Sequence, residues 1–296
     1  MLEFKIPTLE DKEQLQPFYA HVDERSCELT FANMVLWAPH YGVEYTIVNG
    51  MLVLRSKEQN TYSYPLGEGN IKETIEILIE EEKQNGRSLA LHGITPARFE
   101  RLEEMFPGEF TIEYNRDIAD YVYSSEKLAT LAGKKLHGKR NHINRFKENN
   151  PDWSYEPITE ENIPDCMEMA NEWRIENGCD DDPEKKAELC VTFNYLKHFK
   201  ELGVVGGALR ANGKVIAFTI GERVTDDTLV VHIEKAHADI QGAYPMINQQ
   251  FVQHCGENYL YINREEDTGS EGLRKAKLSY RPEFLVEKGI ARKKED

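Results

Sequence analysis

Residues 204–220 read VVGGALRANGKVIAFTI, two apolar runs that flank the pair Asn212-Gly213. An Asn-Gly pair between such runs favours a two-residue turn, because both central positions of that turn need a positive φ. The same arrangement occurs earlier, where residues 43–56 read VEYTIVNGMLVLRS around Asn49-Gly50. Each half of the chain is therefore predicted to contain a β-hairpin.

The elements predicted after each hairpin come in the same order: a strand, a helix entered through glycine, an apolar strand, a capped helix and a last strand. In the first half they are expected at 61–65, 70–84, 88–92, from Thr95 onward, and at 110–114. In the second half they are expected at 228–235, 242–254, 259–262, from Thr268 onward, and at 284–287. A strand near 153–157 and helices near 161–176 and 183–202 precede the second set.

This repeated order predicts two tandem α/β (α+β) domains, each a mixed sheet flanked by helices. The boundary is expected between Tyr123 and Leu131, which gives an N-terminal domain at 1–125 and a C-terminal domain at 126–296. The order resembles the plan of the GNAT (acyl-CoA N-acyltransferase) fold. That resemblance, and not the periodicity, implies two GNAT-like domains.

Composition excludes several classes of protein. The chain has 40% hydrophobic residues, a mean hydropathy of -0.61 and no apolar run near the ~18–20 residues that span a bilayer, so we expect a soluble protein without stable membrane insertion. The five cysteines are an odd number without CxxC spacing, which disfavours a disulfide framework and a metal site. A reducing cytoplasm fits this pattern best.

One basic segment stands out in a chain whose net charge is -16. Residues 133–147 read GKKLHGKRNHINRFK, with six Lys or Arg, two His and no acid. The whole-chain charge opposes binding to nucleic acid and anionic membranes, so a local basic segment favours a specific anionic ligand. We predict that Lys135, Lys139 and Arg140 line an anion site, the alternative being a solvated helix face.

Residues 263–282, NREEDTGSEGLRKAKLSYRP, place acids and bases where an apolar strand ends and a helix begins. Thr268 with Glu271 three residues later predicts a capping box and hence a helix start. Loops after strands are where α/β proteins usually hold reactive groups. We predict that Arg264, Asp267 and Lys277 converge with Glu234 on one pocket that holds the reacting carbonyl and amine.

Three blocks carry a resemblance to a known family. They are residues 28–34 (ELTFANM) with Leu36-Trp37, residues 131–146, and residues 238–244 with Asn248 and the 263–280 stretch. With these blocks the chain resembles the phosphatidylglycerol lysyltransferase C-terminal-like family, which are tandem GNAT-like and Fem-like transferases. The resemblance covers essentially the whole chain. It implies kinship with enzymes that move amino acids from aminoacyl-tRNA.

The resemblance also implies roles for particular residues. A donor pyrophosphate would lie at a helix N-terminus, marked in GNAT proteins by Q/R-x-x-G-x-G/A. Here the corresponding residues are Asp239-Ile240-Gln241-Gly242-Ala243-Tyr244, in which Asp239 and Tyr244 depart from that pattern. A carboxylate on the third strand would act as base and a phenol after the last helix as acid. The residues implied as catalytic are Glu234, Asp267, Lys277 and Tyr280, and those implied for the donor are Gln241, Gly242, Ala243, Tyr244, Asn263 and Arg264, beside Lys135, Lys139 and Arg140.

Together these expectations predict a transferase that moves an acyl or aminoacyl group to an amine or a lipid-like acceptor. The donor is either aminoacyl-tRNA, which the kinship favours, or an acyl-CoA, which the fold and the acidic composition favour. No metal is expected, and tRNA is one candidate partner. The alternative is a non-catalytic ligand-binding protein with a degenerate GNAT cleft.

Overall fold

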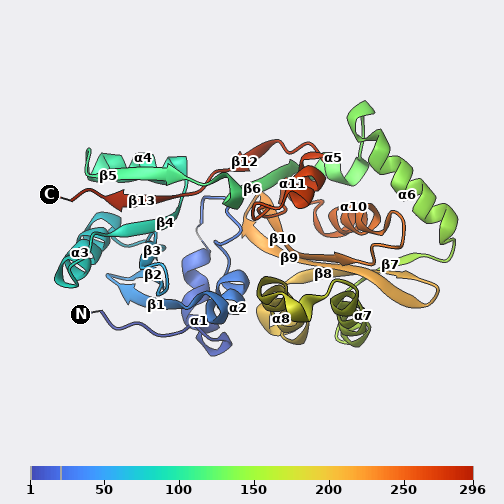
Figure 1. Ribbon diagram of the computed structural model, residues 1–296, viewed down its shortest axis with the longest axis horizontal. Helices are drawn as coiled ribbons and strands as arrows, with labels where there is room; N and C mark the ends of the chain where they lie inside the picture. Colours follow the sequence, from blue (N-terminus) through green and yellow to red (C-terminus); the bar gives the residue numbers. More distant parts are fainter. Residues whose placement is uncertain (1, 21, 296) are drawn as a thin grey trace. The chain divides into compact units, whose positions relative to one another are not determined.

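The computed structural model describes residues 2–20 and 22–295, whose strands form two separate sheets (Figure 1). Both predicted hairpins are present, formed by β1 (Val43–Val48) with β2 (Met51–Ser56) and by β8 (Val205–Ala211) with β9 (Lys214–Thr225). Asn49 and Asn212 both have a φ near 50°, as the Asn-Gly turns require.

The first sheet has the strand order β1-β2-β3-β4-β13-β5. β3 pairs in parallel with β4, so the chain between them must cross over a face of the sheet, and it does so through α3. Apolar residues of these elements form a core that includes Ile75, Leu91 and Leu102. The further elements are α1 (Lys12–Leu15), α2 (Phe31–Tyr41), β3 (Thr61–Ser63), α3 (Ile71–Gln84), β4 (Ala90–Ile94), α4 (Pro96–Met105), β5 (Phe110–Tyr114) and β13 (Gly289–Lys293).

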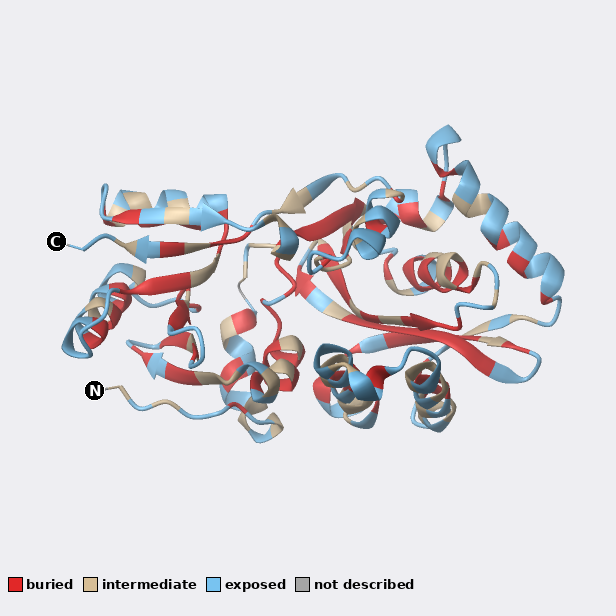
Figure 2. Cartoon of the chain, viewed as in Figure 1, coloured by how far each residue is buried: buried red, intermediate tan, exposed pale blue. Residues whose placement is uncertain are grey.

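The second sheet has the strand order β12-β6-β11-β10-β9-β8-β7. Its central strands β9 and β10 are buried along most of their length (Figure 2), because helices cover them. The further elements are β6 (Asp120–Ser124), α5 (Ser125–Thr130), α6 (His137–Asn149), β7 (Ser154–Pro157), α7 (Ile163–Glu176), α8 (Pro183–Lys197), α9 (Phe199–Leu202), β10 (Thr228–Ala236), α10 (Ala243–Cys255), β11 (Tyr261–Asn263), α11 (Glu271–Leu278) and β12 (Phe284–Val286).

Two strands that the sequence did not predict, β6 and β13, occupy equivalent places in the two sheets. β13 lies between β4 and β5, and β6 lies between β11 and β12. The first sheet therefore takes a strand from the far end of the chain, whereas the second sheet consists of the consecutive strands β6 to β12. Pairing between residues so distant in the chain leaves no local pattern in the sequence.

The chain consequently divides into two discontinuous compact units. Unit 1 comprises residues 1–120, 266–270 and 285–296, and unit 2 comprises residues 121–265 and 271–284. This division differs from the continuous domains 1–125 and 126–296 expected from the sequence. The difference arises because the C-terminal strand β13 pairs with β4 and β5 in the first sheet.

The two predicted helix starts have different outcomes. Thr95 caps α4, since its hydroxyl accepts a hydrogen bond from the backbone N–H of Arg98 and Pro96 follows it. The prediction of a capping box at Thr268 is wrong. Thr268 adopts a left-handed φ of 49°, whereas an N-cap residue is usually extended, and α11 begins only at Glu271.

Candidate active site

The parallel strands β10 and β11 of unit 2 pair over a short length and then separate. Their register joins Thr228–Val230 to Tyr261–Asn263, after which β11 ends and β10 continues to Ala236. An irregularity in the pairing of β10 with β9 lies between Val231 and Ile233. Strand ends that diverge in this way leave room for side chains between them, as at the binding crevices of other α/β sheets.

Glu234 on β10 and Arg264 at the exit of β11 form an ion pair at this point. Arg264 Nη2 donates to Glu234 Oε1 at 2.7 Å, and Asn248 Nδ2 on α10 donates to Glu234 Oε2 at 2.9 Å. The two charged side chains are only 12% and 13% exposed. The structure thus brings together two of the four side chains predicted to share a pocket.

Two polar atoms beside this ion pair lack a hydrogen-bond partner among the described residues. They are Nη1 of Arg264, a donor, and Oδ1 of Asn248, an acceptor, and both are buried. Buried polar atoms are nearly always paired, because an unpaired one loses its hydration without compensation. An unpaired donor and an unpaired acceptor thus lie on either side of Glu234.

Tyr280 follows α11 and forms an aromatic wall of the same cluster. Its ring centroid lies 4.7 Å from Arg264 Cζ, and the Tyr123 ring centroid lies 5.7 Å from that atom. Burial raises the pKa of Tyr280 to about 12, with a further contribution from Glu234 and an opposing one from Arg264. The phenol therefore keeps its proton at neutral pH, as a proton donor to a leaving group must.

Lys139 on α6 contacts the same Tyr280 ring as Arg264. Its ammonium nitrogen lies 4.0 Å from the Tyr280 ring centroid. Burial, and then the charge of Arg264, lower the pKa of Lys139 to about 8 despite the opposing effect of Glu234. Of the three residues predicted to form an anion site, Lys139 is the one that contacts Tyr280.

The other two members of that predicted anion site have different surroundings. Arg140 donates from Nη1 to the carbonyl oxygen of Gly133 at 2.8 Å and also to that of Leu131. It thus binds backbone carbonyls that follow α5. Lys135 is exposed in a short 3-10 helix before α6. An anion site made by all three side chains stays a prediction, and the contacts of Arg140 give it a structural role.

Lys277 and Asn263 support the backbone where β11 ends. Lys277 Nζ donates to the carbonyl oxygen of Arg264 at 2.6 Å, and Asn263 Oδ1 accepts from the N–H of Glu265 at 2.7 Å. Both side chains are buried. These contacts fix the backbone from which Arg264 projects, so the structure favours positioning roles for both residues.

Asp267 lies in unit 1, whereas Glu234 lies in unit 2. Its fully buried carboxylate accepts from Arg116 Nη1 at 3.4 Å and from the N–H of Gly269 at 3.0 Å. These contacts give Asp267 a local role that stabilises the loop before α11, and its convergence with Glu234 stays a prediction. The sequence could not reveal this, because the chain passes from unit 2 to unit 1 within a single residue step, at Glu265–Glu266.

The segment at the start of α10, which was expected to bind the donor, packs tightly against α6 at Gly242. Gly242 has a φ of 85°, and a Cβ there would overlap the carbonyl oxygen of His142 and approach Phe146 Cβ to 3.0 Å. The N–H of Ala243 already donates to Ile240 O at 3.1 Å, and Pro245 has no N–H. Few donors are left there for a pyrophosphate. The side chain of Tyr244 accepts from Trp173 Nε1 at 3.3 Å, and Gln241 is exposed.

If Gly242 serves packing, Gly242→Ala should destabilise the protein by about 2–4 kcal/mol, since it combines an unfavourable φ with overlap against α6. Gly138→Ala is a matched control, because a Cβ there meets nothing within 4 Å. Thermal unfolding of the two variants checks this. A Gly242→Ala variant that melts like the control and has lost affinity for CoA would show instead that the glycine serves a pyrophosphate.

His232 on β10 is held between two carboxylates within unit 2. Nδ1 lies 2.7 Å from Glu265 Oε1 and Nε2 lies 3.0 Å from Glu222 Oε1, and the ring stacks on Tyr195. Burial alone would lower the pKa of His232, but the hydrogen bonds to Glu222 and Glu265 outweigh it and raise the pKa to about 9. The imidazolium links the exit of β11 to strand β9.

This raised pKa predicts a pH-dependent stability. The contribution of His232 is fully present below the pKa of an unfolded histidine, about 6.5, and is lost as pH rises through 9. On the order of 2 kcal/mol should disappear between pH 7 and 10. The difference in melting temperature between the wild type and His232→Gln should therefore shrink over that range. A difference that stays constant would contradict the doubly paired imidazolium.

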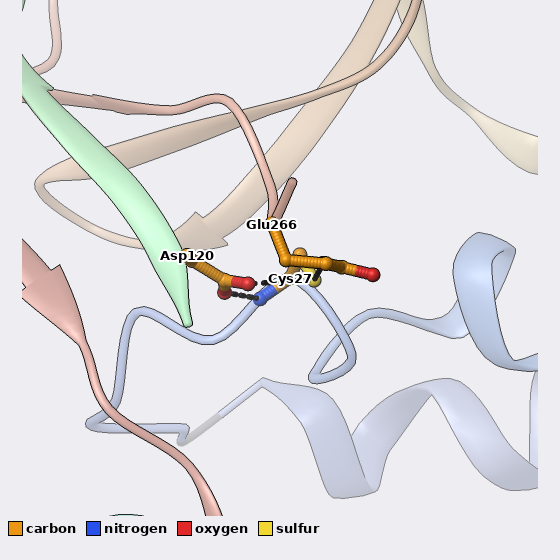
Figure 3. Close-up of side chains that lie close together, drawn as sticks. All are labelled: Cys27, Asp120 and Glu266. Atoms are coloured by element: carbon orange, nitrogen blue, oxygen red, sulfur yellow. Dashed lines mark hydrogen bonds between the residues drawn. The ribbon is translucent and has the colours of Figure 1, made fainter. Parts of the chain in front are cut away.

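A second polar cluster, in unit 1, has the composition of a metal site (Figure 3). Cys27 Sγ, Asp120 and Glu266 offer ligand atoms within 4.8 Å of one another. The buried ammonium of Lys288 lies 2.8 Å from Asp120 Oδ1, 3.8 Å from Cys27 Sγ and 4.0 Å from Glu266 Oε2. That ammonium supplies the positive charge that a metal ion would supply. We therefore assign the cluster to a buried ion pair.

Comparisons with known proteins agree with this architecture. The family model described as "Phosphatidylglycerol lysyltransferase, C-terminal" matches residues 19–292. A conserved protein of unknown function from Bacteroides thetaiotaomicron is 40% identical, with a TM-score of 0.92 over 99% of this chain and 100% of its own. L-PGS from Bacillus licheniformis is 15% identical, with a TM-score of 0.65 over 99% and 95% of the two chains.

The fold predicted from the sequence is confirmed by a further similarity. A GNAT-family acetyltransferase from Colwellia psychrerythraea is 10% identical, with a TM-score of 0.52 over the whole of both chains. The molecule is thus a tandem GNAT-like protein with two mixed sheets flanked by helices. Within residues 2–20 and 22–295, no helix combines the length and the apolar character that crossing a membrane would need.

Proposed function

Because the chain belongs to the family of phosphatidylglycerol lysyltransferase C-terminal domains, we propose that it is a transferase that acts at the Glu234–Arg264 ion pair of unit 2. The proposed donor is an aminoacyl-tRNA, and the proposed acceptor is an amine or a lipid-like molecule. Family membership supports the class of reaction. The donor is argued from the site, and the acceptor is the class expected from the sequence.

One observation supports an aminoacyl group in particular. The cluster has an unpaired donor, Arg264 Nη1, and an unpaired acceptor, Asn248 Oδ1, on either side of a carboxylate. An aminoacyl ester carries a carbonyl oxygen that accepts from Arg264 and an amino group that donates to Asn248. A simple acyl group carries only the carbonyl and would leave Asn248 Oδ1 unpaired.

The remaining groups fit an ester aminolysis. The buried phenol of Tyr280, which stays protonated at neutral pH, is placed to donate a proton to the leaving oxygen. Glu234 holds Arg264 in a fixed orientation, and Lys277 holds its backbone. A preorganised donor aimed at the reacting carbonyl is the main way in which such sites lower a barrier.

An acyl-CoA donor is the second candidate. The net charge of -16 favours it, since an acidic protein repels a polyanionic RNA. The few N–H groups left at the start of α10 weigh against it, because they are the usual pyrophosphate ligands of a helix N-terminus.

A comparison of two donor probes tests the proposal. The first is a non-hydrolysable 3′-aminoacylamido-adenosine and the second is an acyl-CoA. A bound probe at a hundredfold excess over its Kd should stabilise the protein by about 2.7 kcal/mol. We expect the adenosine probe to raise the melting temperature, and radiolabelled amino acid to pass from aminoacyl-tRNA to an added amine or lipid. Binding without transfer from either donor class would support the non-catalytic alternative.

A further inference from the structure

Two cationic side chains of unit 2 meet at the Tyr280 ring. Lys139 Nζ lies 4.0 Å and Arg264 Cζ lies 4.7 Å from its centroid. They come from distant parts of the sequence, Lys139 from α6 and Arg264 from the exit of β11. Like charges brought this close repel each other, so a fold that holds them together requires a compensating negative charge.

The described residues supply only part of that negative charge. Glu234 pairs with Arg264 through Nη2, while Nη1 has no hydrogen-bond partner. The ammonium of Lys139 forms its contact with the face of Tyr280 and no hydrogen bond or ion pair with any residue that the structure describes. Two cations and one carboxylate leave one positive charge in a largely buried cluster. A ligand oxygen with a single negative charge would neutralise that remaining positive charge.

We propose that Lys139 and Arg264 together bind the oxygen that becomes negative during transfer, an inference that rests on the proposed function. The nucleophile attacks the carbonyl carbon, a new bond forms, and the carbonyl π pair moves onto the oxygen. When that pair returns, the bond to the leaving oxygen breaks. The leaving oxygen takes a proton from Tyr280, whose phenolate takes the one that the nucleophile gives up.

The position of Lys139 is fixed by the packing of its helix. The backbone of α6 at His142 lies against Gly242 at the start of α10, so closely that only a glycine fits. Ile143 and Phe146 of α6 are buried in the same unit. A cation on a rigid element close to the reacting oxygen stabilises its charge without having to reorganise. Gly242 would therefore help to position Lys139, through the close contact of α10 with α6, without contacting the donor.

The sign of the pH dependence separates this role from general-base catalysis. The pKa of Lys139, lowered to about 8 by burial and by Arg264, leaves the side chain mostly charged at neutral pH. A cation that stabilises the oxyanion is lost as pH rises through 8, so transfer should fall there. A general base would make transfer rise through the same range. A rise that depends on Lys139 would overturn the proposal.

A pair of small probes tests anion binding without any need for turnover. Methyl methylphosphonate is a tetrahedral monoanion, and dimethyl methylphosphonate is its neutral counterpart. We expect Lys139→Met to weaken binding of the monoanion by about 10- to 100-fold and to leave the neutral ester unchanged, since it removes one charge-assisted contact. Lys139→Arg should recover part of the affinity. Binding is measured by NMR titration at pH 7.

Lys147→Met is the matched control, because Lys147 is an exposed lysine on the same helix. It removes the same charge and should bind the monoanion as the wild type does. Equal weakening in both variants would show a general field effect and overturn the proposal, as would unchanged binding in Lys139→Met. Intact monoanion binding in a wild-type protein that transfers nothing would overturn the proposed function and leave the two-cation anion site supported.

Discussion

Replacement of Lys288 by Met should destabilise unit 1 by about 3–5 kcal/mol, the cost of leaving a buried charge without its partner. The ammonium of Lys288 is fully buried and lies 2.8 Å from Asp120 Oδ1 and 3.2 Å from Glu28 Oε1. Asp120 is also fully buried and accepts from the backbone N–H of Cys27 at 2.8 Å. Without Lys288 its carboxylate must lose its charge or draw in water.

Two further variants make this result specific. Lys293→Met removes a lysine five residues later on β13, whose partner Glu109 is 46% exposed, and should cost no more than about 1 kcal/mol. Asp120→Asn combined with Lys288→Met should be more stable than Lys288→Met alone, because the unpaired charge is gone. Urea unfolding monitored by a unit 1 probe measures all three. Equal stability of Lys288→Met and Lys293→Met would contradict the buried ion pair.

The second large effect concerns turnover. Glu234→Gln keeps the shape of the side chain but removes the charge that orients Arg264, so we expect transfer to fall by about 10²–10⁴-fold. The amide oxygen still accepts from Arg264, but the buried guanidinium loses its charged partner, so stability should fall as well. Transfer is therefore measured at a temperature at which both proteins are folded. The rate of transfer in a single turnover measures this, with the melting temperature recorded beside it.

Glu156→Gln is the matched control for that experiment. Glu156 on β7 pairs with Arg210 Nη2 at 2.7 Å, the same distance as in the Glu234–Arg264 pair. β7 lies at the edge of the second sheet, separated from β10 by β8 and β9. Both variants lose one carboxylate from an arginine pair, and only Glu234→Gln should lose activity. Comparable activity in the two variants would refute a catalytic role for the ion pair.

Much of the fold was predictable because its signals are local. The Asn-Gly turns, the Thr95-Pro96 helix start and the repeated order of elements each depend on a few neighbouring residues. The strands β6 and β13 were not predicted, because each is only five residues long and its pairing is decided by partners far away in the chain. The units are discontinuous because β13 and residues 266–270 belong to unit 1.

The site was predictable in part for the same reason. The strand exit pointed to Arg264, the resemblance pointed to Glu234 as the carboxylate of the third strand, and the acid-free run pointed to Lys139. Asn248 gave a signal that was not used for the site, an amide on the apolar face of α10 beside Ile247 and Phe251. Asp267 belongs to unit 1 and Arg264 to unit 2, and their proximity in the sequence hides this passage of the chain from one unit to the other.

A crystal structure with 3′-aminoacylamido-adenosine bound tests the aminoacyl-transfer site at Glu234 and Arg264 most directly. We predict its amide carbonyl within hydrogen-bond distance of Arg264 Nη1 and its amino group within hydrogen-bond distance of Asn248 Oδ1, since these are the unpaired atoms beside Glu234. Electron density for the probe in any position that leaves both atoms without a partner would contradict an aminoacyl-transfer site at Glu234 and Arg264.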